Sequence, residues 1–242
     1  MDIGIGVTSY KRPNECQQVC ASILKSLTVG HNYSLVCSVD HEADGSYAGK
    51  IPSGFVPIFH ANGGVAANKN RVLSKLKDNN LVFIFEDDIL IRRSGWIELF
   101  LTAIQETGMK HFNYIRLDHR TDLYKIARTQ NLTIGFYKKN TAQLMVMTNE
   151  VIEKVGAFDM RYGKFGFEHA DYTRRCKGAG LCQPAHHNIH PHIFDMDIFI
   201  EEMNVEPCYN NTLRKQYSDE ANKVYLDFNP NKIFVPFPEG DY

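Results

Sequence analysis

Apolar residues in the first third of the chain follow two kinds of spacing. Residues 3–9, 34–39 and 81–85 are short, strand-like stretches, and the last is an unbroken run of apolar side chains. Such a run is typical of a strand that is buried on both faces. Between these stretches, residues 13–27 and 65–76 carry apolar side chains at helical spacing. The repeated order of strand, helix and strand predicts an α/β fold with a mostly parallel central sheet flanked by helices.

The second half of the chain predicts further elements in a less regular order. Ser94 is placed to cap a helix, and residues 112–117 have the composition of a strand. Residues 132–137 and 142–148 predict two strands joined by a short turn, which gives a small antiparallel hairpin. A helix is expected at about 168–177.

Composition and charge narrow the class of protein. The chain has 242 residues, of which 43% are hydrophobic and 23% are charged, as in ordinary globular proteins. The formal net charge of -1 does not indicate a nucleic-acid-binding surface, although it leaves room for a local basic patch. The first residues lack the pattern of a signal peptide, and no apolar run approaches the roughly 20 residues that cross a bilayer. We therefore expect a cytoplasmic protein without a membrane span.

Cysteine usage agrees with a reducing compartment. The six cysteines are scattered, without a CxxC pair of the kind that binds metal, and we expect reduced, mostly buried thiols. Cys16 and Cys20 are four residues apart, which places them on one face of a helix.

Three carboxylates follow the apolar run at 81–85. Glu86, Asp87 and Asp88 would stand at the carboxyl end of a central strand, where parallel sheets bind their ligands. Clustered carboxylates repel one another unless a cation lies among them. A hard divalent cation, Mn²⁺ or Mg²⁺, that also binds a phosphate is the natural partner. The alternative is a solvated acidic turn.

Three more polar clusters follow predicted strands or open a predicted helix. They are residues 8–12, Asp40 with Asp44, and the segment 166–171. Each has a simple structural explanation; for example, Asp171 and Arg175 are spaced to form an ion pair along a helix. The order of the whole set is more informative than any member.

In this order the motifs resemble those of GT-A-fold glycosyltransferases, namely the large family 2 and the galactosyl- and GalNAc-transferases with a Trp-Gly-x-Glu-Asp segment. The resemblance spans about residues 3–192. It rests on five segments, which are Val7–Pro13, Val39–Asp40, Asn62–Asn70, Phe85–Asp88 and Phe165–Asp171.

This resemblance implies one GT-A domain, Rossmann-like, that transfers a sugar from a nucleotide diphosphate to a hydroxyl group of a glycan or another acceptor. We expect a nucleotide-sugar half at about 1–90, an acceptor half at about 91–194 and a C-terminal surface tail at about 195–242. The physical role of the metal is to neutralise charge on the leaving diphosphate.

The resemblance also implies roles for individual residues on the donor side. Asp40 would accept a hydrogen bond from the base, as uracil N3–H requires, so a UDP-sugar is favoured. Asp88 matches the direct metal ligand of the DxD motif, and Glu86 or Asp87 would reach the ribose or a metal-bound water. The remaining donor-side residues are Thr8, Tyr10, Arg12, Asn62, Gly63, Lys69 and Asn70.

The acceptor side departs from the family pattern. The family has Glu-Asp, with the Asp as general base, whereas this chain has Glu168-His169. Glu168, His169 or Asp171 is the base; a carboxylate is usual, which favours Glu168. Glu168 and Asp171 are three residues apart and share a helix face.

A histidine-rich segment at 181–194 offers a further metal ligand. In an extended chain His186, His190 and His192 lie on one face. The resemblance implies one metal-binding histidine here, first His190 and then His192. A dedicated zinc site built from these histidines is the lesser alternative, because no cysteine stands at ligand spacing.

The leading hypothesis is therefore a metal-dependent, inverting glycosyltransferase. One alternative is a sugar-phosphate nucleotidyltransferase, although the loop at 8–12 lacks the glycines that such enzymes use. The other is a protein that binds nucleotide sugars or glycans without transfer. A nucleic-acid acceptor is disfavoured by the net charge.

Overall fold

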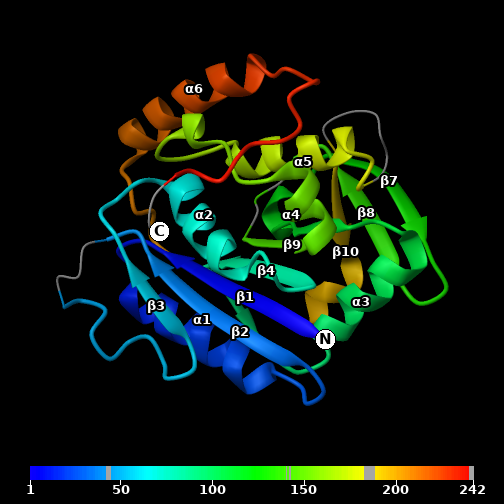
Figure 1. The fold of residues 1–242 in the computed structure, drawn as a ribbon, viewed down its shortest axis with the longest axis horizontal. Coiled ribbons are helices and arrows are strands. Elements are labelled where there is room, and N and C mark those ends of the chain that lie inside the picture. Colours follow the sequence, from blue (N-terminus) through cyan, green and yellow to red (C-terminus); the bar gives the residue numbers. More distant parts are fainter. Residues whose placement is uncertain (42–44, 140, 142, 183–188, 240–242) are drawn as a thin grey trace.

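The apolar run at 81–85 forms most of strand β4, which lies at the centre of a six-stranded sheet in the computed structural model (Figure 1). The structure describes residues 1–41, 45–139, 141, 143–182 and 189–239. The strand order is β3-β2-β1-β4-β9-β6. Strands β1 to β4 run parallel, and β9 runs antiparallel to both its neighbours. Their bounds are β1 Asp2–Ser9, β2 Asn32–Val39, β3 Val56–Phe59, β4 Leu81–Glu86, β6 His111–Tyr114 and β9 Leu144–Thr148.

Helices cover both faces of this sheet and form two separate hydrophobic cores. Leu81, Phe83 and Phe85 of β4 face one core, whereas Val82 and Ile84 face the other. The first core is closed by α1 (Pro13–Ser26) and α3 (Trp96–Thr107). The second is closed by α2 (Val65–Leu76), α4 (Asn149–Val155) and α5 (Glu168–Gly178). The predicted α/β class, with a mostly parallel sheet flanked by helices, is confirmed.

Glycine lets α2 approach β1 closely. The sequence of β1 alternates Ile and Gly, and a Cβ on Gly6 would lie 1.9 Å from Val72 Cγ1. The isoleucines of β1 fill the opposite core. The polar end of β1 and the start of α2 are therefore held beside each other.

A small antiparallel hairpin exists, but residues 132–137 form it with residues 123–128 and not, as predicted, with residues 142–148. Strand β8 (Thr133–Tyr137) pairs with β7 (Leu123–Arg128) and β10 (His190–Ile193) in a three-stranded antiparallel sheet. The next strand, β9, joins the central sheet instead of pairing with β8. The alternation of apolar and polar residues predicts that β8 and β9 are strands, but it does not determine which strand each of them pairs with. A two-stranded sheet of β5 (Ile89–Ile91) and β11 (Ile200–Glu202) completes the strands of the described residues.

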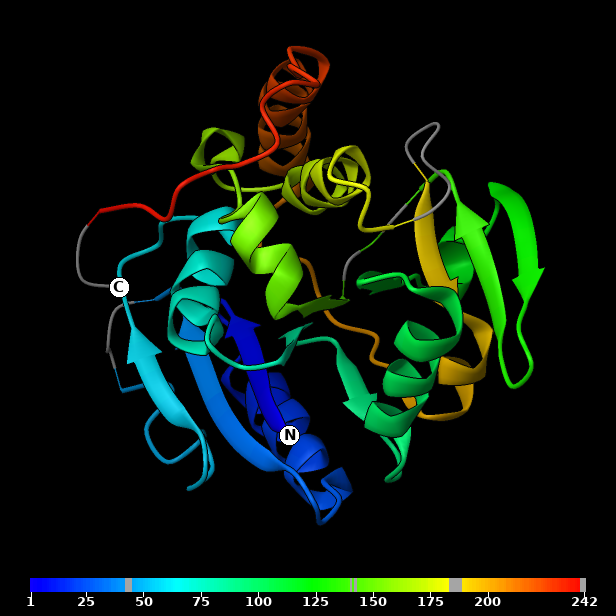
Figure 2. The same cartoon turned by 45° about the vertical axis from the view of Figure 1, so that its right-hand side comes forward.

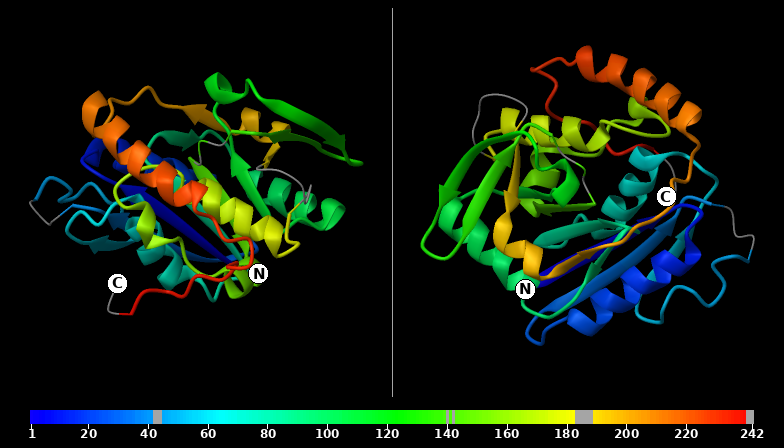
Figure 3. Two further views of the ribbon diagram at one scale, coloured as in Figure 1. Left: turned by 90° about the horizontal axis from the view of Figure 1, so that it is seen from above. Right: turned by 180° about the vertical axis from the view of Figure 1, so that it is seen from behind.

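Two helix predictions also need correction. Helix α3 begins after Gly95, which has a left-handed conformation, so Ser94 does not cap it. The C-terminal segment contains α6 (Asn211–Leu226), which the sequence reading did not predict; the side chain of Asn210 caps it by accepting from Leu213 N at 2.9 Å. Figures 2 and 3 show α6 and the segment after it lying beside α5, at the end of the molecule opposite α1. No helix in the described part of the chain is long and apolar enough to cross a membrane.

The turn before α2 depends on glycine at one position. Gly64 has a φ of 97°, and a Cβ there would lie 2.2 Å from the backbone oxygen of Gly163. We expect Gly64→Ala to lower the free energy of unfolding by about 2 kcal/mol or more, since strain and a backbone clash combine. Chemical denaturation measures this. Gly180→Ala is the control, with a φ of 75° but open space around it; equal losses in both variants would contradict the clash.

Candidate active site

A cleft of about 610 Å³ lies where β1, β2 and β4 end. Parallel sheets bind ligands at this edge. Both helix starts next to it, at α2 and α5, contribute to its wall, as does the C-terminal segment before α6. Predicted site residues in the lining are Thr8, Tyr10, Arg12, Asp40, Glu86, Asp87, Asp88, Glu168 and His169.

Asp87 connects the acidic end of β4 to the loop after β1. Its Oδ2 accepts a hydrogen bond from Ser9 Oγ at 2.6 Å, and its Oδ1 accepts one from Arg12 Nη1 at 2.9 Å. Burial raises the pKa of Asp87 to about 6, and the nearby charge of Arg12 opposes that rise. Asp87 therefore holds the β1 loop in place and has its oxygens occupied by protein donors.

Asp88 is the acidic residue without such partners. It is 7% exposed, and among the described residues no hydrogen-bond donor contacts its Oδ1. The nearest cation to its Oδ2 is Arg116 Nη1 at 3.8 Å. Burial, together with the charges of Glu86 and Asp87, raises the pKa of Asp88 above its ordinary value. A buried carboxylate oxygen without a donor fits a ligand for Mn²⁺ or Mg²⁺.

Lys69 lies between the acidic strand end and the start of α5. Its side chain is fully buried, and its Nζ is 2.8 Å from Glu86 Oε1 and 2.9 Å from Glu168 Oε1. These two carboxylates raise the pKa of Lys69 despite the burial. The predicted donor-binding lysine thus connects the donor and acceptor walls from behind the cleft.

The start of α5 brings Glu168 and His169 together. Glu168 Oε1 is 3.1 Å from His169 Nδ1, and it also accepts a hydrogen bond from Lys69 Nζ. Although its burial acts in the other direction, the charges of Lys69 and His169 lower the pKa of Glu168 far below its ordinary value. Phe167 precedes them with a φ of 64°, a strained conformation for a residue with a side chain.

Asp171 points to a different set of partners. Its Oδ2 accepts a hydrogen bond from Arg175 Nε at 2.7 Å, and Arg175 also donates to the backbone oxygens of Val155 and Ala157. Asp171 is not among the described residues that line the cleft. This ion pair, the simpler explanation given by the spacing, argues against Asp171 as the base.

Asp40 holds the glycine turn before α2. Its two oxygens accept hydrogen bonds from the backbone N–H groups of Gly63 and Gly64, each at 2.8 Å, and from Arg71 Nη1 at 2.8 Å. The predicted role of Asp40 toward a nucleotide base stays a prediction, because a carboxylate oxygen accepts more than one donor. Asp44 lies outside the described residues.

The C-terminal segment before α6 reaches across the β1 loop. Arg12 Nη2 donates to the backbone oxygen of Glu206 at 2.8 Å, and Cys208 Sγ donates to that of Tyr10 at 3.0 Å. The rings of Tyr10 and Tyr209 stack with centroids 5.5 Å apart. Asn62 Nδ2 donates to the Tyr209 hydroxyl at 3.1 Å. The predicted surface tail thus forms part of the cleft.

Asn70 has a structural role that the resemblance did not imply. Its side chain is fully buried, donates to the backbone oxygen of Phe158 at 2.9 Å and accepts from the Phe158 N–H at 2.7 Å. Because both ends of the amide are occupied by one backbone unit, this placement argues against Asn70 as a donor-binding residue.

The histidines of β10 lie away from the cleft lining. His192 is fully buried; its Nδ1 accepts from Ile115 N at 3.2 Å and its Nε2 is 3.2 Å from Asp197 Oδ1. His190 is 2% exposed, and burial lowers its pKa well below the ordinary value. The contacts of His192 argue against it as a ligand of a metal at Asp88, whereas His190, whose Nδ1 is buried and has no hydrogen-bond partner among the described residues, stays a predicted ligand. His186 and His187 are outside the described residues.

Several residues of the cleft lining were not predicted from the sequence, among them Arg116, Lys164, Tyr209 and Arg214. Arg116 follows β6 and lies at the same sheet edge as the other polar strand ends, so its position after a predicted strand could have indicated a site residue. Lys164 precedes α5, and Tyr209 and Arg214 lie just before and within α6, a segment without a motif. Only long-range folding brings these three to the cleft.

The fold is shared with solved glycosyltransferases, in agreement with the resemblance seen in the sequence. No family model matches the chain. The chain is 25% identical over 212 residues to the uncharacterized glycosyltransferase R363 of Acanthamoeba polyphaga mimivirus, which covers 81% of this chain and 78% of that protein.

Two solved structures share the fold at low sequence identity. The mannosyltransferase PcManGT from Pyrobaculum calidifontis, in complex with GDP-Man and Mn²⁺, has a TM-score of 0.62 at 11% identity over 95% of this chain. This chain covers 66% of that protein, just under two thirds of its length. S. aureus TarS 1-349, in complex with UDP-GlcNAc, has a TM-score of 0.58 at 10% identity, covering 96% of this chain and 74% of that one.

Proposed function

We propose that this chain is a metal-dependent, inverting glycosyltransferase that moves a sugar from a nucleotide diphosphate, with a UDP-sugar favoured, to an acceptor hydroxyl. The observation that carries the proposal is Asp88. It is a buried carboxylate at the end of a central parallel strand, inside the cleft, with one oxygen that no described donor contacts. Solvated acidic turns, the alternative explanation of the triplet, do not bury such an oxygen.

Asp88 would hold Mn²⁺ or Mg²⁺, which when bound supplies positive charge to the leaving diphosphate. The other donor-side residues act directly. Arg12 is fixed by Asp87 and lies at the cleft wall together with Arg116. Their guanidinium groups suit phosphate oxygens, which they can bind through paired N–H groups. Tyr10 offers an aromatic face for the nucleotide base.

On the acceptor side we assign the general base to His169 and an orienting role to Glu168. Glu168 is already bonded to Lys69 and is a weak base, since its pKa is lowered. Its contact with His169 Nδ1 at 3.1 Å resembles the carboxylate–imidazole pairs in which the carboxylate orients the ring and stabilises the imidazolium. His169 also stands where the family motif has its base. The imidazole would take the proton from the acceptor hydroxyl as the sugar is transferred.

The donor base is the less constrained part of the proposal. One structural neighbour binds GDP-Man and another binds UDP-GlcNAc. A UDP-sugar remains the proposed donor because Asp40, at the end of β2, and Tyr10 line the same cleft. We also propose that the protein is cytoplasmic, that it forms one domain with a donor half and an acceptor half, and that its acceptor is a glycan or another molecule with a hydroxyl group.

A donor screen tests this function. The full chain is incubated with UDP-, GDP- and dTDP-sugars, with and without Mn²⁺, and the melting temperature and the release of nucleoside diphosphate are measured. A ligand that binds only the folded state raises the melting temperature. We expect a Mn²⁺-dependent rise with a UDP-sugar and release of UDP. A rise without release, with acceptors present, would favour a binding protein. Product formation from a nucleoside triphosphate and a sugar phosphate would favour a nucleotidyltransferase.

A further inference from the structure

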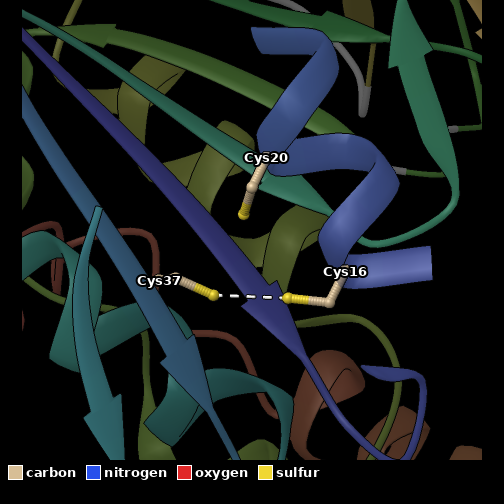
Figure 4. A group of neighbouring side chains, drawn as sticks. All are labelled: Cys16, Cys20 and Cys37. Carbon is tan, nitrogen blue, oxygen red and sulfur yellow. Dashed lines mark hydrogen bonds between the residues drawn. The ribbon is translucent and has the colours of Figure 1, made fainter. Parts of the chain in front are cut away.

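Three cysteines meet in the core beneath the β1 loop (Figure 4). Cys16 and Cys20 come from α1, and Cys37 comes from β2. All three are fully buried, and their sulfur atoms lie within 4.8 Å of one another. Cys16 Sγ and Cys37 Sγ are 3.4 Å apart. The spacing of the cysteines does not indicate this cluster, because Cys37 is 17 residues from Cys20 and has no motif partner.

The sulfur positions match a three-coordinate metal centre. In a trigonal site with metal–sulfur bonds of about 2.3 Å, the sulfur atoms are about 4 Å apart. The sulfur atoms of Cys16 and Cys37 are 3.4 Å apart and the other two separations do not exceed 4.8 Å, so the three atoms are close to this spacing. A cation at the centre would therefore need only small side-chain movements.

The ligand set selects the kind of cation. Thiolates prefer soft cations such as Cu(I), whereas Mn²⁺ and Mg²⁺ prefer oxygen. Among the described residues, no fourth His, Cys, Asp or Glu side chain joins the group. Structural zinc is almost always four-coordinate, so three ligands fit zinc poorly. We propose that Cys16, Cys20 and Cys37 form a binding site for Cu(I) that is distinct from the divalent-cation site at Asp88.

The start of α1 favours negative charge on one of the three sulfur atoms. Cys16 is in the first turns of α1, where the helix dipole stabilises a thiolate. Each thiol that coordinates Cu(I) gives its proton to the solvent, with no change of oxidation state. The hydroxyl of Ser9, which also lies beside Cys16, donates to Asp87 at 2.6 Å, so the metal would brace the layer directly under the β1 loop.

Anaerobic loading with Cu(I) tests the site. The full chain is reduced, loaded with one equivalent of Cu(I) and then dialysed against a Cu(I) chelator. The copper that the protein retains and its thiolate-to-copper absorption are measured. We expect about one retained copper per chain in the wild type, and at least about tenfold weaker retention in Cys37→Ser, because a three-coordinate site loses one ligand.

Cys176→Ser is the matched control, since Cys176 is equally buried but lies in the opposite core; it should retain copper like the wild type. Circular dichroism verifies folding, and Cys20→Ala provides a second variant if Cys37→Ser does not fold. The proposal would be overturned if the wild type did not retain copper, or if Cys37→Ser and Cys20→Ala retained it as well as the wild type.

Discussion

Asp88→Asn should reduce kcat/KM for sugar transfer by at least about a hundredfold, or about 2.7 kcal/mol of transition-state stabilisation. Asn keeps the shape of the side chain but removes the negative charge that would hold the cation. Because Asp88 Oδ1 has no described donor, the substitution breaks no hydrogen bond at that atom. The fold should therefore survive, and burial of a neutral amide costs less than burial of an unpaired charge. Steady-state kinetics with the donor from the screen measures the loss.

The control for this variant is Asp78→Asn, which removes the same charge at an exposed position after α2. Its activity should stay within about twofold of the wild type, since surface charges act weakly at a distance. Wild-type kinetics in Asp88→Asn, at unchanged Mn²⁺ dependence, would remove the metal assignment.

His169→Gln should lower the rate of transfer by about 10²- to 10⁴-fold while leaving donor affinity within a few-fold. Glutamine can replace a hydrogen bond to Glu168 but cannot take up the acceptor proton. Calorimetry of UDP binding separates the two effects, because it does not depend on the chemical step. Glu168→Gln should also be impaired, through loss of the orienting carboxylate.

His31→Gln is the matched control, because His31 also lies beside a glutamate, with its Nε2 3.7 Å from Glu98 Oε1, but is not among the residues that line the cleft. It should transfer at the wild-type rate. An active His169→Gln enzyme combined with an inactive Glu168→Gln enzyme would return the base to Glu168, as a carboxylate base would predict.

The elements that the sequence predicted best are those whose pattern is local. The run at 81–85 is apolar on both faces because both faces of β4 are covered, and this is visible without any partner. The same holds for α1, whose predicted bounds agree with Pro13–Ser26 to within a residue. The strand-end clusters could be predicted as one site because parallel strands bring their carboxyl ends together.

Features that depend on distant partners were not predictable in the same way. Nothing in the sequence of β9 states that it pairs with β4 and β6 instead of β8. The link of Lys69 to both Glu86 and Glu168 joins residues 99 positions apart, so spacing rules cannot detect it. Tyr209 reaches Tyr10 from the far end of the chain in the same manner.

His192 of β10 shows how a correct pattern can mislead. His190 and His192 do share a face of an extended strand, as their spacing requires. That face is buried, however, and His192 contacts the backbone of Ile115 and the carboxylate of Asp197. A buried histidine with protein partners on both nitrogens has the same sequence signature as a metal ligand.

The proposed activity depends on one contact, between the acidic end of β4 and a cation that binds the donor diphosphate. Calorimetric titration of UDP into the full chain, in Mn²⁺ and then in excess chelator, measures it most directly. We predict affinity at least about tenfold higher in Mn²⁺, or about 1.4 kcal/mol. Equal affinity in both conditions would contradict the account.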